Sequence, residues 1–336
     1  MRKFLMLSAA LTLSVSTAQN ANVAFVYWNT ANAAFQEMAM GVKQAVKESR
    51  GTKLVSTAPN GTNPSQVVSM FQSAAQTSKS GIVLQALTPD LFLRPIKTAT
   101  DAGIPVVSID APPPRNAGVN LFVSNDNVEL GRQVAREILK KIPANARGKI
   151  VIGTSNPGVP PIEARVEGMI EVIKKERPNV TIVGPLETRG QTGSPSDVFT
   201  VWNGIVRANP DALAFLSPTN SDPGQLALIQ RQLGRKFLVG GCDLEPTALE
   251  AVKNGYVDVL VSPEHWLKGY VAMKLLLGQT QGGAKIPTGF WNTGGLVVTR
   301  ANIDKVLARQ KTEASRALAL VPVARRQLAN PGAYLK

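Results

Sequence analysis

Residues 102–110 read Ala-Gly-Ile-Pro-Val-Val-Ser-Ile-Asp, and the pattern of this stretch recurs along most of the chain. Gly103 and Pro105 end a helical pattern, and a short apolar run continues to Ile109. A continuous apolar run is typical of a strand covered on both faces, as in a parallel sheet. Asp110 follows at the carboxyl end of this strand, where open α/β sheets bind their ligands. We therefore treat Asp110 as a candidate ligand-binding residue.

Between Asn22 and Ser262, apolar strand-like runs alternate with helical segments whose apolar residues recur with a period of about 3.6 residues. This alternation predicts an α/β fold with doubly wound parallel sheets. The other strand candidates are Val23–Tyr27, Lys53–Thr57, Gly81–Gln85, Leu121–Ser124, Ile150–Gly153, Thr181–Gly184, Ala212–Leu216, Phe237–Gly240 and Val257–Ser262.

So many strands are more natural in two similar lobes than in one open sheet. The chain has three candidate crossings between lobes, within 108–127, near 262–264 and near 291–294, which together predict a three-strand hinge. The predicted N-terminal lobe is 19–124 plus 264–291, and the predicted C-terminal lobe is 125–263 plus 292–336.

The first 18 residues have the order of a secretory signal peptide. Arg2 and Lys3 are followed by the apolar run Phe4–Val15 and by small residues that end at Ala18, before Gln19. The apolar run is shorter than the roughly 20 residues that span a bilayer, and a buried core helix is the alternative interpretation. We predict that 1–18 is cleaved and that the mature protein is periplasmic or otherwise extracytoplasmic.

Composition is that of a globular protein, with 336 residues, 44% apolar, 18% charged and a net charge of +14. The basic residues are scattered, with no arginine-rich block, so solvated helix faces are favoured over a nucleic-acid surface. After the leader we find no apolar run of membrane-spanning length, and we expect a soluble monomer without a nucleic-acid partner.

Cysteine and histidine are nearly absent from the chain. Cys242 is the one cysteine, so no internal disulfide forms, and its apolar surroundings predict a buried thiol. His265 is the one histidine, which excludes a multi-histidine metal site. We find no nucleophile, phosphate-loop or metalloprotease motif, so the sequence predicts a protein that is not an enzyme and has no metal or cofactor.

Polar and aromatic side chains follow the ends of several predicted strands. Carboxylates accept hydrogen bonds from hydroxyl groups, a guanidinium donates them, and aromatic rings cover the apolar face of a sugar. This combination predicts a site for a polyhydroxylated ligand. The candidates are Trp28, Asn32, Phe35, Asp110, Arg165, Asn220, Asp243, Glu264 and Trp266.

Structural roles remain open for these residues. Asp110 and Asn220 could belong to ordinary turns, and Asp243 could cap the helix that begins near Pro246. Arg165 could be a surface charge, and the aromatic candidates could be core residues.

An ordered set of motifs extends over nearly the whole mature chain and resembles the periplasmic sugar-binding proteins of ABC transporters, in particular the ribose-type, or type I, group. The motifs are Asn32-Ala33-Ala34-Phe35 with Gly41, Ala102–Asp110, Ser124-Asn125-Asp126-Asn127 with Gly131-Arg132, Ala164-Arg165-Val166-Glu167-Gly168, Ala208-Asn209-Pro210-Asp211, Val239-Gly240-Gly241-Cys242-Asp243, and Thr293-Gly294 before Leu296–Thr299.

The resemblance implies two lobes joined by three crossing strands, a closed form that docks on a membrane permease, and sugar contacts from Asn32, Phe35, Asp110, Arg165 and Asp243. Several positions depart from the family pattern. Ala33 and Ala34 replace a proline and a phenylalanine, for which Trp28 or Trp266 is the candidate substitute. Ala111 replaces an arginine that often follows the aspartate. Pro263 replaces a glutamine, whose contact could pass to Glu264.

We therefore expect an exported solute-binding protein that captures a monosaccharide-like sugar and delivers it to an ABC importer. A periplasmic sensing module for a chemoreceptor or sensor kinase is the alternative. A secreted hydrolase that uses Asp110 and Asp243 as acid and base is a further alternative, less favoured by the sequence.

Overall fold

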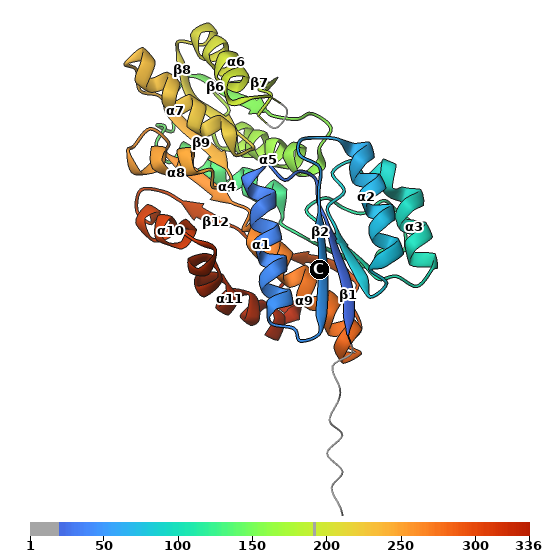
Figure 1. Ribbon diagram of the computed structural model, residues 1–336. Coiled ribbons are helices and arrows are strands. Elements are labelled where there is room, and N and C mark those ends of the chain that lie inside the picture. Colours follow the sequence, from blue (N-terminus) through green and yellow to red (C-terminus); the bar gives the residue numbers. More distant parts are fainter. Residues whose placement is uncertain (1–19, 191–192) are drawn as a thin grey trace, which may run out of the picture.

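The computed structural model describes residues 20–190 and 193–336, which form two six-stranded sheets flanked by helices (Figure 1). The predicted leader, 1–18, lies outside the described residues. Within them, each of the ten predicted strands overlaps an observed strand, and the predicted two-lobed α/β fold is confirmed. Cys242 is buried at the end of a strand, as predicted.

The first lobe is built on a parallel sheet with the strand order β11-β5-β4-β3-β1-β2. Its strands are β1 (Ala21–Val26), β2 (Thr52–Thr57), β3 (Gly81–Leu84), β4 (Val106–Ile109), β5 (Leu121–Ser124) and β11 (Gly289–Asn292). Its helices are α1 (Ala33–Lys47), α2 (Pro64–Thr77), α3 (Leu93–Asp101) and α9 (His265–Gly282). β3 and β4 are buried along their whole length, as continuous apolar runs predict.

The second lobe repeats this arrangement with the strand order β12-β10-β9-β8-β6-β7, in which β12 alone is antiparallel to its neighbour. Its strands are β6 (Gly148–Thr154), β7 (Val180–Glu187), β8 (Ala212–Ser217), β9 (Leu238–Cys242), β10 (Val259–Ser262) and β12 (Leu296–Val298). Its helices are α4 (Asn127–Leu139), α5 (Pro160–Glu176), α6 (Pro195–Ala208), α7 (Ser221–Leu233), α8 (Pro246–Lys253) and α10 (Ile303–Gln310).

Paired glycines let two helices approach closely in each lobe. In the first lobe, a Cβ at Gly41 of α1 would lie 2.1 Å from the backbone oxygen of Trp266 in α9, and Gly269 faces α1 in the same way. In the second lobe, a Cβ at Gly131 of α4 would lie 1.9 Å from the backbone oxygen of Arg165 in α5. The glycines therefore fix where α9 and α5 lie, and both helices supply side chains to the cleft.

The described residues cross between the lobes four times, one more than predicted. The three predicted crossings connect β5 to α4, β10 to α9 and β11 to β12. The fourth connects α10 to α11 (Glu313–Ala329), because Val306 of α10 belongs to the second lobe's core while Leu320 and Ala324 of α11 belong to the first.

The C-terminal segment therefore corrects the predicted assignment of all of 292–336 to the second lobe. After α11 the backbone of Lys336 exchanges hydrogen bonds with Phe290 of β11 in the first sheet. An amphipathic pattern shows that a helix buries one face, but not which of two cores it covers. Among the described residues, no helix is long and apolar enough to cross a membrane.

Candidate ligand-binding cleft between the lobes

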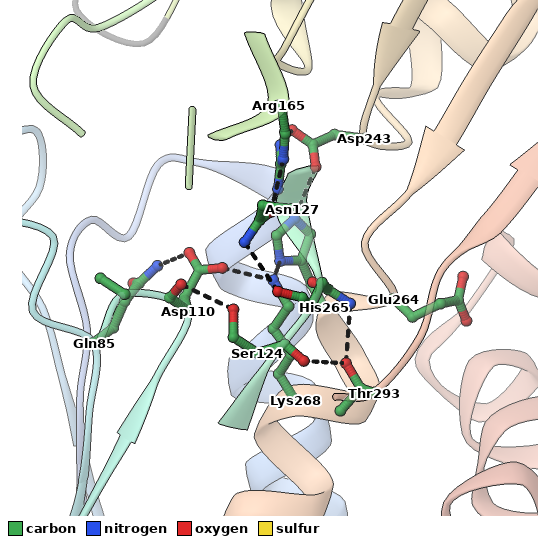
Figure 2. Close-up of polar contacts among 12 residues, drawn as sticks. Gln85, Asp110, Ser124, Asn127, Arg165, Asp243, Glu264, His265, Lys268 and Thr293 are labelled. Atoms are coloured by element: carbon green, nitrogen blue, oxygen red, sulfur yellow. Dashed lines mark hydrogen bonds and ion pairs between the residues drawn. The ribbon is translucent and has the colours of Figure 1, made fainter. Parts of the chain in front are cut away.

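The two predicted carboxylates occupy equivalent turns in the two lobes. Asp110 follows β4 and Asp243 follows β9, and each has a left-handed φ of 70°. Each backbone N–H donates to the neighbouring strand, Asp110 to Val123 and Asp243 to Val261, at 3.0 Å in both cases. Left-handed residues other than glycine are uncommon and concentrate at functional sites. The two turns direct these carboxylates into the same cluster (Figure 2).

A chain of polar contacts joins the two carboxylates through α9. Lys268 Nζ donates to Asp110 Oδ1 at 2.6 Å and lies 3.4 Å from His265 Nδ1, while His265 Nε2 lies 2.8 Å from Asp243 Oδ1 (Figure 2). An ammonium group only donates, so Nδ1 accepts from Lys268 and Nε2 carries the proton that is donated to Asp243. The chain thereby connects the first lobe to the second.

Arg165 completes the cluster from α5 of the second lobe. Its Nη1 donates to Asp243 Oδ2 at 3.4 Å and to the backbone oxygen of Pro218 at 2.8 Å. Its Nε donates to Asn127 Oδ1 at 3.0 Å. The side chain is only 4% exposed, so the interpretation of Arg165 as a surface charge is wrong.

The buried charges keep both carboxylates ionised. Burial on its own raises the pKa of Asp110, but the charge of Lys268 and the hydrogen bond from it overcome this effect and hold the pKa well below its usual range. For Asp243, burial is overcome in the same way by Arg165 and by the hydrogen bond from His265, and its pKa is also lowered. The cluster contains cations and anions in equal number, Lys268 and Arg165 against the two aspartates, which offsets part of the cost of burying them.

A cavity of about 400 Å³ opens beside this cluster, between the lobes. Its walls come from the start of α1, the loops after β8 and β9, the start of α9, and the α10–α11 crossing. Its lining includes Asp243 and His265 of the charged cluster, together with Asn220, Glu245, Ala33 and Ala34. Cavities of this size that contain a few converging polar groups are typical of small-molecule sites.

Two predicted amide residues lie at the cleft. Asn220 lines the cavity, and its Nδ2 donates to Glu245 Oε2 at 3.2 Å. Asn32 is the N-cap of α1, where its Oδ1 accepts from the backbone N–H of Ala34 at 2.9 Å. Asp243 is not a helix cap, because Glu245 is the N-cap of α8.

The predicted aromatic residues lie in the first lobe's core. Trp28 is 3% exposed and Phe35 is 4% exposed. Trp266 is 1% exposed and stacks on Tyr270 with ring centroids 5.0 Å apart. The ring of Trp266 therefore packs within the interior and is not available to replace a stacking residue in the cleft.

Glu264 is also directed away from the charged cluster (Figure 2). Its carboxylate accepts hydrogen bonds from both terminal nitrogens of Arg309, at 2.9 and 3.0 Å. Glu264 is the N-cap of α9 with a left-handed φ of 51°, and this turn sends its side chain toward α10 while His265 enters the cleft. Neither Glu264 nor Trp266 belongs to the site proposed below.

The prediction missed Lys268 and gave His265 no binding role. Lys268 is fully buried, and it is the one charged residue in the apolar stretch Trp266–Met273. Because lysine is rarely buried without a partner, its place in this stretch was a usable signal. Lys268 also gives Asp110 a cationic partner, whereas Ala111, at the position where an arginine often follows the aspartate, cannot.

Comparison with known proteins places these features in a family. The family model of the periplasmic binding protein domain matches residues 23–284. The D-allose-binding periplasmic protein of Escherichia coli is 25% identical over 285 residues, which cover 82% of this chain and 90% of the relative. The xylose/arabinose-binding protein of Sulfolobus acidocaldarius is 22% identical over 267 residues, 74% of this chain, and the match spans 64% of that relative's length.

The fold is also that of solved solute-binding proteins. The structure of an ABC transporter solute-binding protein from Agrobacterium vitis with bound D-fucose superposes with a TM-score of 0.77 at 23% identity, and the match covers 84% of this chain and 97% of that one. A solute-binding protein from Burkholderia graminis in complex with D-arabinose has a TM-score of 0.76 at 22% identity, covering 85% of this chain and 98% of the other. The chain described here belongs to the periplasmic binding protein family.

Proposed function

We propose that this protein is an exported solute-binding protein that captures a monosaccharide-like sugar between its lobes and delivers it to an ABC importer. The observation that carries the proposal is the chain of contacts from Asp110 through Lys268 and His265 to Asp243, with Arg165 beside it. The relatives and neighbours named for allose, xylose, arabinose and fucose support a sugar as the ligand class.

The proposed chemistry uses acceptors and donors that converge at one place. Asp243 accepts hydrogen bonds from neighbouring sugar hydroxyls, Arg165 donates to ring or hydroxyl oxygens, and Asp110 contributes from the first lobe. Asn32 and Asn220 add amide contacts, and Phe35 and Trp28 support the site from the first lobe's core. A ligand that contacts both lobes binds the closed state better than the open state and shifts the population toward closure.

The remaining parts of the proposal concern the protein's place in the cell. The leader 1–18 directs export, the mature monomer works outside the cytoplasm, and the closed form docks on the importer's permease. The protein binds its ligand without converting it. Membership of the periplasmic binding protein family supports each of these statements.

Calorimetric titration with a panel of neutral aldoses tests the proposal. The wild-type protein should bind at least one of them, and Asp243→Asn should weaken that binding by about tenfold or more, because hydrogen bonds to a charged group contribute roughly 1.5–3 kcal/mol. Asp101→Asn, at an exposed position of α3, is the matched control and should bind as the wild type does. Equal binding by Asp243→Asn would refute the site, and turnover of a bound sugar would refute the non-enzymatic role.

A further inference from the structure

The cavity beside the charged cluster is longer than one pyranose ring. It contacts Ala33 and Ala34 in the first turn of α1 and also Met40, seven residues further along the helix. At 1.5 Å per residue, this stretch of α1 is about 10 Å long. Asp243 and His265 line the same cavity and belong to the proposed sugar site. A single ring held at Asp243 therefore leaves part of the cavity unfilled.

Small side chains on α1 create this room. Ala33 and Ala34 carry only methyl groups where α1 faces the cavity. Opposite them, Leu244 and Leu249 of the second lobe provide apolar surface, next to the carboxylate of Glu245. Apolar surface interspersed with a few polar groups suits a ring that has hydroxyls on its edge and C–H groups on its face.

The fourth crossing forms the remaining wall. Gln310 Nε2 donates to Glu37 Oε1 at 2.7 Å, and Arg316 Nε donates to Gln310 Oε1 at 2.7 Å. Arg316 also forms an ion pair with Glu37 at 3.4 Å. These three side chains come from α1, α10 and α11 and hold one another in place, and all three line the cavity. They present a fixed set of polar groups at a distance along α1 from the charged cluster.

The charges around the cavity favour an uncharged occupant. The carboxylates of Asp243, Glu245 and Glu250 lie on the second-lobe wall and repel an anionic group. Burial and the nearby Asp243 charge raise the pKa of Glu245, and Asn220 donates a hydrogen bond to it. On the opposite wall the charge of Arg316 is paired with Glu37, which leaves Lys311 as the lining cation that faces the three carboxylates.

We propose that this cavity binds the second ring of a neutral disaccharide whose first ring is held at Asp243 and His265. Gln310, Arg316 and Glu37, the triad of this cavity, contact the second ring, and the small side chains of Ala33 and Ala34 leave room for it. This inference rests on the proposed function, since it extends the ligand of the same cleft.

The test compares neutral aldoses with disaccharides that contain the same ring, by calorimetric titration of the full protein. The wild type should bind a disaccharide about tenfold or more tightly than the matching monosaccharide. Ala34→Phe places a ring in the cavity, so the ratio of disaccharide to monosaccharide affinity should fall by about tenfold. Gln310→Ala, which removes two contacts of the triad without adding bulk, should reduce the same ratio if Ala34→Phe is poorly folded.

Ala144→Phe adds the same ring at an exposed loop position outside the cavity and is the matched control, expected to leave both affinities unchanged. A wild-type protein that binds monosaccharides as tightly as every disaccharide would overturn the inference while the proposed function stands. An unchanged ratio in both cavity variants would also overturn it. If neither class of sugar binds, the proposed function itself fails, and the inference fails with it.

Discussion

Lys268 is the residue on which the buried charges of the cleft depend most. Its side chain is 0% exposed, and its ammonium group is 2.6 Å from Asp110. Breaking a buried ion pair by removing one partner typically costs 3–5 kcal/mol, because the other charge stays buried. Lys268→Met should therefore lower the free energy of unfolding by roughly 3 kcal/mol or more, measured by urea denaturation.

The double variant Lys268→Met/Asp110→Asn removes both charges and should recover a large part of that loss. Lys97→Met breaks the exposed pair of Lys97 with Asp101 and should cost only about 0–1 kcal/mol. If Lys268→Met is no more destabilising than Lys97→Met, Lys268 does not neutralise Asp110 in the folded protein.

Asp222, in the first turn of α7, should make the stability of the protein depend on pH. Its carboxylate is fully buried and accepts hydrogen bonds from the neutral hydroxyls of Ser217 and Thr188. Burial raises its pKa to about 6. A raised folded-state pKa gives stability that is fully present below the unfolded pKa of about 4 and is lost as the pH rises through 6.

Asp222→Asn should remove this dependence. The unfolding free energy of the wild type relative to Asp222→Asn should fall by about 2 kcal/mol between pH 4 and pH 7, as measured by urea denaturation at several pH values. A difference between the two proteins that stays constant over this range would show that Asp222 does not titrate in it.

Residues of the site that follow a strand end could be predicted from the sequence, but the directions of other side chains could not. Asp110 and Asp243 could be predicted because each follows the carboxyl end of a strand in its own sheet, where open α/β sheets bind their ligands. The grouping of both with Arg165 of α5 followed from the family resemblance. The direction of Glu264 and Trp266 could not be predicted, because it depends on a left-handed turn before α9 and on the face of α9 that meets α1. Periodicity identifies the helix but does not set its first residue to within one position.

Helix pairs built on glycine hold the charged side chains in position. The Cβ of an alanine at position 131 would lie 1.9 Å from the backbone oxygen of Arg165, so α4 and α5 must separate to admit it. Gly131→Ala should lower the unfolding free energy by about 1–3 kcal/mol and also weaken sugar binding, because Arg165 moves with α5.

Gly204→Ala is the matched control, since Gly204 lies within α6 and a Cβ there has no atom within 4 Å. Replacing an exposed helical glycine by alanine should stabilise the protein by up to about 1 kcal/mol and leave sugar binding unchanged. Urea denaturation and calorimetric titration of both variants measure the two effects. If Gly131→Ala is destabilised but binds sugar normally, the close contact between α4 and α5 does not control the binding site.

Helix α11 shows that an apolar pattern predicts a helix but does not determine which core the helix covers. Its sequence indicates a helix with one buried face, and Leu320 and Ala324 are buried as such a face requires. Which lobe receives that face depends on the turn at Gln310–Thr312 and on the shapes of two separate cores. The additional crossing could therefore not be predicted, whereas the repeated strands of both sheets could.

In the part of the chain that the structure describes, four crossings link the lobes, and side chains from both lobes meet in the cleft. A ligand that binds only the folded state stabilises it by mass action, by about 2.7 kcal/mol at a ligand concentration one hundred times Kd. Wild-type protein should show this gain in unfolding free energy with its sugar, and Asp243→Asn should show much less at the same concentration. A gain of equal size in both proteins would place the sugar away from Asp243.

Crystallography of the sugar complex tests the central claim most directly. The account predicts one sugar bound between the lobes, with hydroxyl oxygens at about 2.7–3.2 Å from the Asp243 carboxylate and the Arg165 guanidinium, and with further contacts from the first lobe. A sugar held by one lobe only, or bound at a surface that excludes Asp243 and Arg165, would contradict it.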